Sequence, residues 1–235
     1  MQDILIATVN EYIRDGLPVS SQALHENYDF GIGTASIRVE LNDLEEKGWL
    51  SQPHTSGGRI PTNRAFEFFA DIVRADIVAK NTKETHETDL AERFLEDELS
   101  DFIEGFASSM QLLSVGFDFL NDEIYKSGLD QLFAHLDVEE PHAYQEIAHD
   151  FEELDERIGH YLKGGHEETV GPMVFIGKKS PVTRSEHLTT IFDIFDVGGR
   201  TVFLGAIGPK RMDYKKSMHT FINLKKAVQN NDRSH

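Results

Sequence analysis

The spacing of apolar residues changes along the chain, and this change restricts the fold more than any other feature of the sequence. Through the first two thirds, apolar residues recur every three or four positions, as on one face of an α-helix. In the last third, three segments predict strands: 170–176, 188–197 and 201–207. Gly198 and Gly199 predict a hairpin turn between the last two strands, and helical spacing returns over Tyr214–Val228. We therefore expect an α+β fold with a small antiparallel sheet covered by a C-terminal helix.

The first 75 residues predict three helices followed by a two-stranded hairpin and a fourth helix. The first helix covers 3–14 and ends at Gly16 and Pro18, because glycine suits a helix C-terminus and proline cannot continue a helix. Ser20 or Ser21 can cap a second helix, and Thr34 can cap a third. The remaining features are a buried stripe of Ile37, Leu41 and Leu44, strands at 49–52 and from Ile60, and a helix from Thr62. This order is typical of a winged helix-turn-helix domain.

Two further helices are predicted in the middle of the chain, at 87–113 and 141–163. The first has a broad apolar face that includes Phe94, Leu99, Phe102 and Phe106. Because this face exceeds what a small sheet would cover, we expect the central helices and the sheet to form a homodimer interface. The predicted domains are a DNA-binding domain at 1–75 and a dimerisation and regulatory region at 76–235.

The net charge of -18 is concentrated in the middle of the chain, where residues 76–165 hold 23 Asp and Glu and 6 Lys and Arg. Any DNA binding must therefore depend on a few well-placed cations. The 235 residues include no cysteine, and the sequence predicts neither a signal peptide nor a membrane span, so a cytoplasmic protein is expected. The pairs His142–Glu146 and His149–Glu153 have metal-ligand spacing, but solvated residues are the favoured interpretation, and no metal or cofactor is expected.

Short polar residues and arginines gather where a winged helix would meet DNA. A recognition helix enters the major groove by its N-terminal end, where small polar groups meet phosphates and an arginine can read guanine. Arg38 follows the buried Ile37 and therefore points away from the core. The glycines of the 54–59 turn would allow close backbone approach. The candidate DNA-binding residues are Ser20, Ser21, Thr34, Ser36, Arg38, His54, Thr55, Ser56, Gly57, Gly58, Arg59 and Arg64.

Each of these features also has a purely structural explanation. A threonine before a helix is usually only a cap, and a glycine pair in a hairpin is usually only a turn. Arg59 can instead pair with an acidic neighbour such as Glu45 or Glu46. The ordered combination favours DNA binding over these separate explanations.

The same segment resembles a known family. Residues 16–71 are similar to the winged-helix domain of the HrcA heat-inducible transcription repressors, above all in the string from His54 to Thr62. The strings at 16–21 and 34–38 also match, and 207–214 resembles the C-terminal signature of the family. Weaker similarities lie at 124–129, 176–177 and 197–199.

The resemblance implies a bacterial homodimeric repressor that binds an inverted repeat of double-stranded DNA upstream of chaperone genes and is nucleoid-associated when bound. It also implies a GAF-like C-terminal domain, here expected to be reduced because family members are usually longer, and a GroEL-type chaperonin as partner. Val39 stands where the family typically has asparagine, and Gln22 where it often has lysine, so a different operator preference is expected.

Two other functions remain open on the sequence. The reduced C-terminal domain would suit an effector-sensing regulator, and the acidic winged helix would suit a protein-interaction adaptor with weakened DNA binding. No P-loop, dinucleotide-binding glycine fingerprint or nucleophile elbow is present, so no enzyme is predicted.

Overall fold

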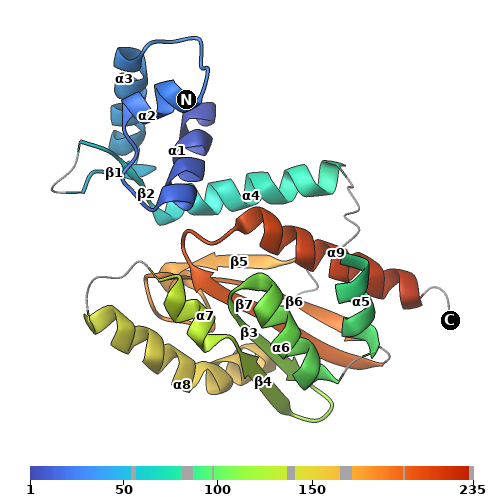
Figure 1. Cartoon of the computed structure of the whole chain (residues 1–235). Helices are drawn as coiled ribbons and strands as arrows, with labels where there is room; N and C mark the ends of the chain where they lie inside the picture. Colours follow the sequence, from blue (N-terminus) through green and yellow to red (C-terminus); the bar gives the residue numbers. More distant parts are fainter. Residues whose placement is uncertain are drawn as a thin grey trace. The chain divides into compact units, whose positions relative to one another are not determined.

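The computed structural model describes residues 1–53, 57–80, 87–96, 98–136, 141–164, 171–197 and 199–232 (Figure 1). The chain divides into two compact units, Met1–Ile72 and Val73–His235. Among the described residues, no helix combines the length and apolar character needed to cross a membrane. In the same part of the chain, no group of three or more His, Asp or Glu side chains is placed to hold a metal ion.

The N-terminal unit contains three helices, a short hairpin and the start of a fourth helix. Its elements are α1 (Gln2–Asp15), α2 (Ser21–Asn27), α3 (Thr34–Glu46), β1 (Leu50–Ser51), β2 (Ile60–Pro61) and α4 (Asn63–Lys80), which continues past the unit boundary. Helix α1 ends at Gly16, which has a φ of 67° and donates its N–H to the Tyr12 carbonyl. The core is built from the apolar faces of these helices: Leu5, Val9, Leu24, Ile37, Leu41, Leu44 and Phe66 are buried.

The C-terminal unit is a mixed α/β structure around one antiparallel sheet. Its helices are α5 (Glu87–Glu96), α6 (Leu99–Met110), α7 (Leu129–Ala134), α8 (Pro141–Lys163) and α9 (Tyr214–Asp232), with a 3-10 turn, η1, at Gly177–Lys179. Its strands are β3 (Leu113–Asp118), β4 (Glu123–Ser127), β5 (Met173–Ile176), β6 (Leu188–Val197) and β7 (Arg200–Pro209). The strand order is β4-β3-β7-β6-β5. Val197 pairs with Arg200 and Gly199 has a φ of 82°, whereas Gly198 lies outside the described residues.

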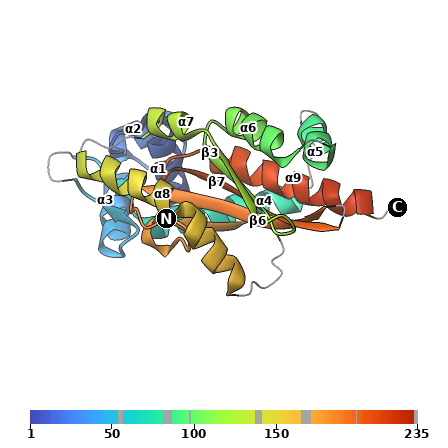
Figure 2. The same cartoon turned by 90° about the horizontal axis from the view of Figure 1, so that it is seen from below.

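Helices cover both faces of this sheet (Figures 1 and 2). Side chains alternate along β6, so Asp193 faces α9, where Lys225 Nζ lies 3.1 Å from its Oδ1. Phe192 faces the other way and joins a buried cluster with Leu154 and Ile158 of α8. Seen from below, α8 crosses the strands on this second face (Figure 2). The expected small antiparallel sheet with a C-terminal helix is therefore present, within three layers.

The single helix predicted over 87–113 is wrong. The structure has two helices there, α5 and α6, and Leu113 already begins strand β3. Helix α6 ends at Gln111, which adopts the left-handed conformation with a φ of 58°. Glycine is the usual residue at such a position, so the sequence lacks the signal that would have marked this helix end.

The prediction that the middle of the chain is mostly helical is also wrong. Strands β3 and β4 lie at 113–127 and complete one side of the sheet. Gly116 belongs to β3, and a Cβ at this position would lie 2.8 Å from the Ile103 side chain. The glycine therefore allows α6 to pack closely on the strand.

The apolar face predicted to form a dimer interface is buried inside the chain's own core. Phe94, Leu99, Phe102 and Phe106 are each no more than 3% exposed. The Phe94 ring lies 5.1 Å from that of Phe195 on β6, and the Phe106 ring lies 5.7 Å from that of Phe221 on α9. The sheet is larger than expected and uses this face, so these four residues do not form an intersubunit surface.

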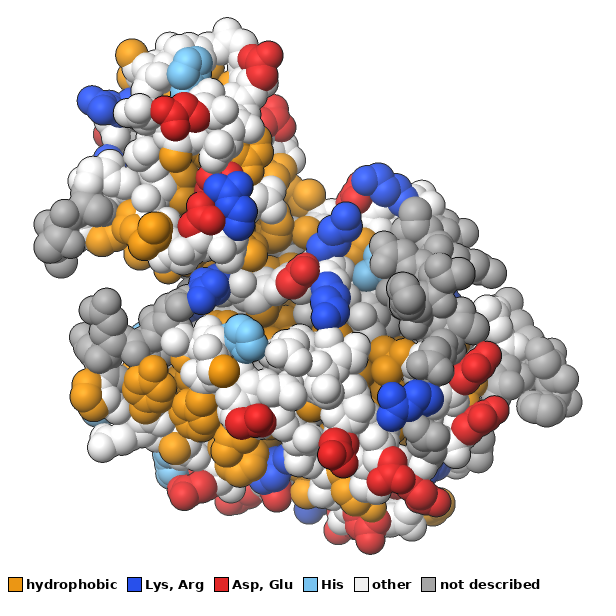
Figure 3. All heavy atoms as spheres, viewed as in Figure 1, with side chains coloured by type: hydrophobic (Ala, Val, Ile, Leu, Met, Phe, Trp, Pro, Cys, Tyr) orange, Lys and Arg blue, Asp and Glu red, His pale blue; other side chains and the backbone are white. Residues whose placement is uncertain are grey.

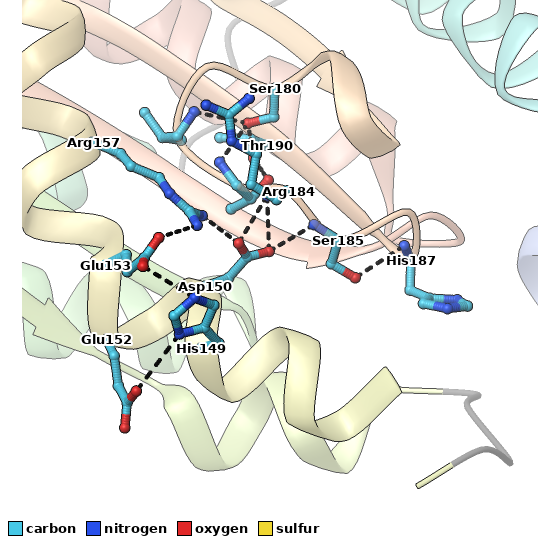
Figure 4. Close-up of polar contacts among 12 residues, drawn as sticks. His149, Asp150, Glu152, Glu153, Arg157, Ser180, Arg184, Ser185, His187 and Thr190 are labelled. Carbon is cyan, nitrogen blue, oxygen red and sulfur yellow. Dashed lines mark hydrogen bonds and ion pairs between the residues drawn. The ribbon is translucent and has the colours of Figure 1, made fainter. Parts of the chain in front are cut away.

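Asp150 of α8 ties this helix to the loop that precedes β6 (Figure 4). Its carboxylate accepts the backbone N–H of Arg184 at 2.8 and 2.9 Å and that of Ser185 at 2.7 Å. Arg157, seven positions further along the same helix, pairs with Asp150 and with Glu153. Ser180, in the same loop, is also hydrogen-bonded to Thr190 of β6, with 3.0 Å between the two hydroxyl oxygens. Burial of the Asp150 carboxylate is therefore compensated by three donors, the N–H groups of Arg184 and Ser185 and the Arg157 guanidinium.

Candidate nucleic-acid interface

The start of α2 is capped as predicted. Ser20 accepts a hydrogen bond from the Ala23 N–H at 3.1 Å, which satisfies one of the free donors at the helix N-terminus. Ser21 is the first residue of the helix and is buried, with 7% exposed surface. Of the two serines, Ser20 is therefore the more accessible.

The predicted cap of α3 is wrong by one residue. Gly33 is the N-cap and has no side chain to bond, whereas Thr34 is already the first helical residue. The preceding turn forms around Gly31, whose φ is 68° and whose N–H donates to Asp29 Oδ1 at 3.0 Å. Because Gly33 supplies no capping oxygen, the first N–H groups of α3 stay available to an anion. Ser36 is exposed beside them.

Arg38 differs from every other lysine and arginine of residues 1–75. Residues 1–75 contain six Lys and Arg residues, all in the described part of the chain. Five of them interact with other protein groups: Arg14, Lys47, Arg59, Arg64 and Arg74. Arg38 is exposed and, among the described residues, has none. Its guanidinium is thus free to bind an external acceptor without breaking an existing bond.

Arg59 is held against α3. Its Nε lies 2.7 Å from Glu45 Oε2, its terminal nitrogen donates to Asn42 Oδ1 at 2.8 Å, and its side chain is only 12% exposed. This is the acidic pairing that the sequence offered as the alternative to DNA contact. Its backbone also pairs with Val19, through N–H to O bonds of 2.9 and 2.8 Å. Arg59, directly before β2, therefore binds both α3 and Val19 in the loop before α2.

Arg64 also has partners. It donates to the Lys47 carbonyl at 2.9 Å, and its guanidinium lies 3.8 Å from the centre of the Trp49 ring. It remains exposed at the surface of α4. A phosphate would have to bind those N–H groups of the Arg64 guanidinium that do not donate to the Lys47 carbonyl.

The two glycines of the predicted DNA-contacting turn have different environments. Neither glycine has a positive φ. Gly58 is buried, and a Cβ there would lie 2.7 Å from the Pro18 backbone, whereas a Cβ on the exposed Gly57 would meet no described residue within 4 Å. Gly58 is therefore required by close packing on Pro18. The candidates His54, Thr55 and Ser56 lie outside the described residues.

Sequence reasoning missed Asn42, which binds Arg59, and Ala35, which presents exposed apolar surface on α3. It named Glu45 as an alternative partner of Arg59, and Val39 only as a departure from the family pattern. The signal was available in the helical spacing, because Asn42 and Glu45 lie four and seven positions after Arg38 and share its flank.

A family model matches this chain over residues 61–218, and its description is HrcA protein C terminal domain. The chain belongs to the HrcA family. Curated relatives named heat-inducible transcription repressor HrcA are similar over shorter stretches of sequence. One from Clostridium botulinum is 46% identical over 68 residues, which are 29% of this chain and 20% of the relative.

Two other HrcA relatives match longer segments of this chain. One from Pelotomaculum thermopropionicum is 35% identical over 113 residues, covering 48% of this chain and 31% of the relative. One from Sorangium cellulosum is 44% identical over 93 residues, covering 40% and 26%. The matched segments thus span between a fifth and a third of the length of these relatives.

The fold of this HrcA-family chain is also similar to a solved structure. A crystal structure of a hypothetical protein aligns with a TM-score of 0.74 and 18% identity, and the alignment covers 99% of this chain and 98% of the other. At this identity the similarity supports the fold alone.

Proposed function

We propose that residues 1–75 of this HrcA-family chain form a winged helix-turn-helix domain and that the chain is a sequence-specific transcriptional repressor. In this domain α2 and α3 are the helix-turn-helix, and α3 is the recognition helix. The observation that carries the proposal is the unpartnered Arg38 near the N-terminus of α3, beside an uncapped first turn and the exposed Ser36. The names of the relatives point to heat-inducible repression.

The proposed repressor acts in the bacterial cytoplasm as a homodimer on an inverted repeat upstream of chaperone genes, with a reduced GAF-like domain at 76–235. A GroEL-type chaperonin is its proposed regulatory partner. Ser36 and the first N–H groups of α3 bind phosphate and Arg38 reads a base edge, and Ser20, Thr34 and residues 54–59 are proposed as further contacts. Arg64 is proposed to add a phosphate contact.

The test is selection of duplexes from a random DNA pool by the full chain, followed by anisotropy titration at several salt concentrations. Sequence-specific repression predicts enrichment of an inverted repeat and binding to the chain's own upstream region. A pool that yields no enriched sequence would contradict the proposal.

A protein-interaction adaptor is the second candidate function. It is favoured by one observation, that Arg59 and Arg64, two of the few cations near α3, are already held by protein groups. An adaptor predicts weak DNA binding with no sequence preference, and the same titrations distinguish it from a repressor.

A further inference from the structure

The exposed face of α3 has an apolar centre. Ile37, Leu41 and Leu44 are buried and fix the inner face of this helix. At about 100° per residue, Ala35 and Val39 lie on the opposite side, one turn apart. Both are exposed, and Val39 has 66% of its surface accessible. The side chain that points most directly outward is therefore a valine, with Arg38 beside it.

The flank of α3 that carries Arg38 is turned toward the hairpin. Arg38, Asn42 and Glu45 share this flank, and the last two bind Arg59 just before β2. Arg38 therefore reaches a ligand from one side of the helix, while Val39 faces it directly.

Charge limits which part of this face can meet DNA. Residues 34–39 contain Arg38 and no carboxylate, whereas residues 40–46 contain four: Glu40, Asp43, Glu45 and Glu46. The positive end of the helix dipole adds to the first half and the negative end to the second. A polyanion is therefore attracted to the half that carries Ala35 and Val39 and is repelled by the remainder. An apolar partner such as a protein helix would not be attracted by the charge of the first half of α3.

We infer that Val39, with Ala35 one turn before it, recognises the C5-methyl groups of thymines in the major groove. The inference rests on the proposed function. Thymine is the base that presents a methyl group there, and apolar side chains are the groups that contact it. Burial of one methyl group between Val39 and DNA contributes about fourfold in affinity. The operator then contains thymine at one or two fixed positions for each recognition helix, next to the base read by Arg38.

The test replaces single thymines by deoxyuridine in a duplex selected from a random pool, which removes the methyl group and leaves base pairing unchanged. Affinities are measured for the full chain and for Val39→Ala, which keeps an exposed helical position filled by a good helix former. Val78→Ala is the matched control, because Val78 is a comparably exposed valine on α4, with 62% accessible surface.

The expected result is a loss of about fourfold at one or two positions for the wild type and Val78→Ala, and less than twofold at the same positions for Val39→Ala. If specific duplexes are selected but no deoxyuridine position distinguishes wild type from Val39→Ala, the inference is wrong and the proposed function stands. If no duplex is selected at all, both are wrong.

Discussion

Arg38 and Val39 are neighbours in sequence with different tasks on the proposed DNA surface. Arg38 carries a charge that no described protein group neutralises, and Val39 carries apolar surface of which 66% is accessible. A charged donor can bind both phosphates and base edges, so its specificity must be measured separately from its affinity.

Replacing Arg38 with alanine should cost about 1–3 kcal/mol at a selected operator and relax the sequence preference at one position of each half-site. Anisotropy with the operator and with random duplexes of equal length measures both effects. Lys47→Ala is the control, because Lys47 directly follows the last residue of α3 and pairs with Asp43 at 2.7 Å. Equal losses on operator and random DNA would assign Arg38 to a phosphate.

Asp193 is a buried carboxyl in the C-terminal unit, and burial raises the pKa of its carboxyl above the ordinary 3.8, against the opposing effect of Lys225. Because the folded state holds this proton more tightly than the unfolded chain, its contribution to stability is present at low pH and is lost as the pH rises from about 3.8 through the folded pKa. Denaturant unfolding of wild type and Asp193→Asn across this window should show the wild type losing stability relative to the variant as pH increases. A constant difference would contradict the raised pKa.

At the scale of elements, Gly58→Ala should destabilise the N-terminal unit by about 1–3 kcal/mol, because its Cβ would overlap the Pro18 backbone at 2.7 Å. Gly57→Ala is the matched control and should be nearly neutral, since its Cβ would meet nothing within 4 Å in the described part of the chain. Chemical denaturation of both variants checks this. If the two alanines were equally tolerated, the packing of Gly58 on Pro18 would not be structurally required.

Asp150→Ala should destabilise the C-terminal unit by about 3 kcal/mol, because it leaves two backbone N–H groups and Arg157 without their shared acceptor. On the same helix, Asp155→Ala removes an ion pair with Lys126 whose carboxylate side is 48% exposed, and should cost less than about 1 kcal/mol. Urea unfolding would measure both. Similar values for the two variants would mean that the Asp150 contacts add little to stability.

The elements that could be predicted from sequence are those with long periodic stretches and conventional ends. Helix α8 was predicted with its exact bounds, and α1 ends at the glycine that the sequence marks. The end of α6 could not be predicted because Gln111 occupies the left-handed position. In the candidate site, the exposure of Arg38 can be predicted because its neighbour Ile37 is buried. Whether Arg59 pairs with Glu45, 14 positions earlier, could not be decided from the sequence because it depends on how the hairpin packs on α3.

At the scale of the molecule, the distribution of acidic charge limits where DNA can bind and therefore which dimers are compatible with DNA binding. Acidic side chains lie along the lower edge of the C-terminal unit in Figure 3, in keeping with the acidic middle of the chain. DNA is therefore expected to be repelled from that region and to bind the N-terminal unit. Two N-terminal units on one duplex require a dimer whose interface lies outside the buried phenylalanines of α5 and α6.

Sedimentation velocity at micromolar concentration should show a species of twice the 26.6 kDa monomer mass, because a twofold dimer presents two copies of α3 to an inverted repeat. DNA selected by the chain should then contain two half-sites related by a dyad. A monomer that selects single half-sites would contradict the dimer and leave DNA recognition intact.

The close approach of Gly58 to Pro18 and the two hydrogen bonds between Val19 and Arg59 have a consequence for how chains of this family diversify. The hairpin and the loop at 16–20 are interlocked, so they must be inherited together. A chimera that takes the hairpin from a homologue without that loop places a foreign backbone against Pro18. If α3 is the recognition helix, as proposed, new operator preferences are easier to acquire by changes on its outer face, where Ala35 and Val39 are exposed.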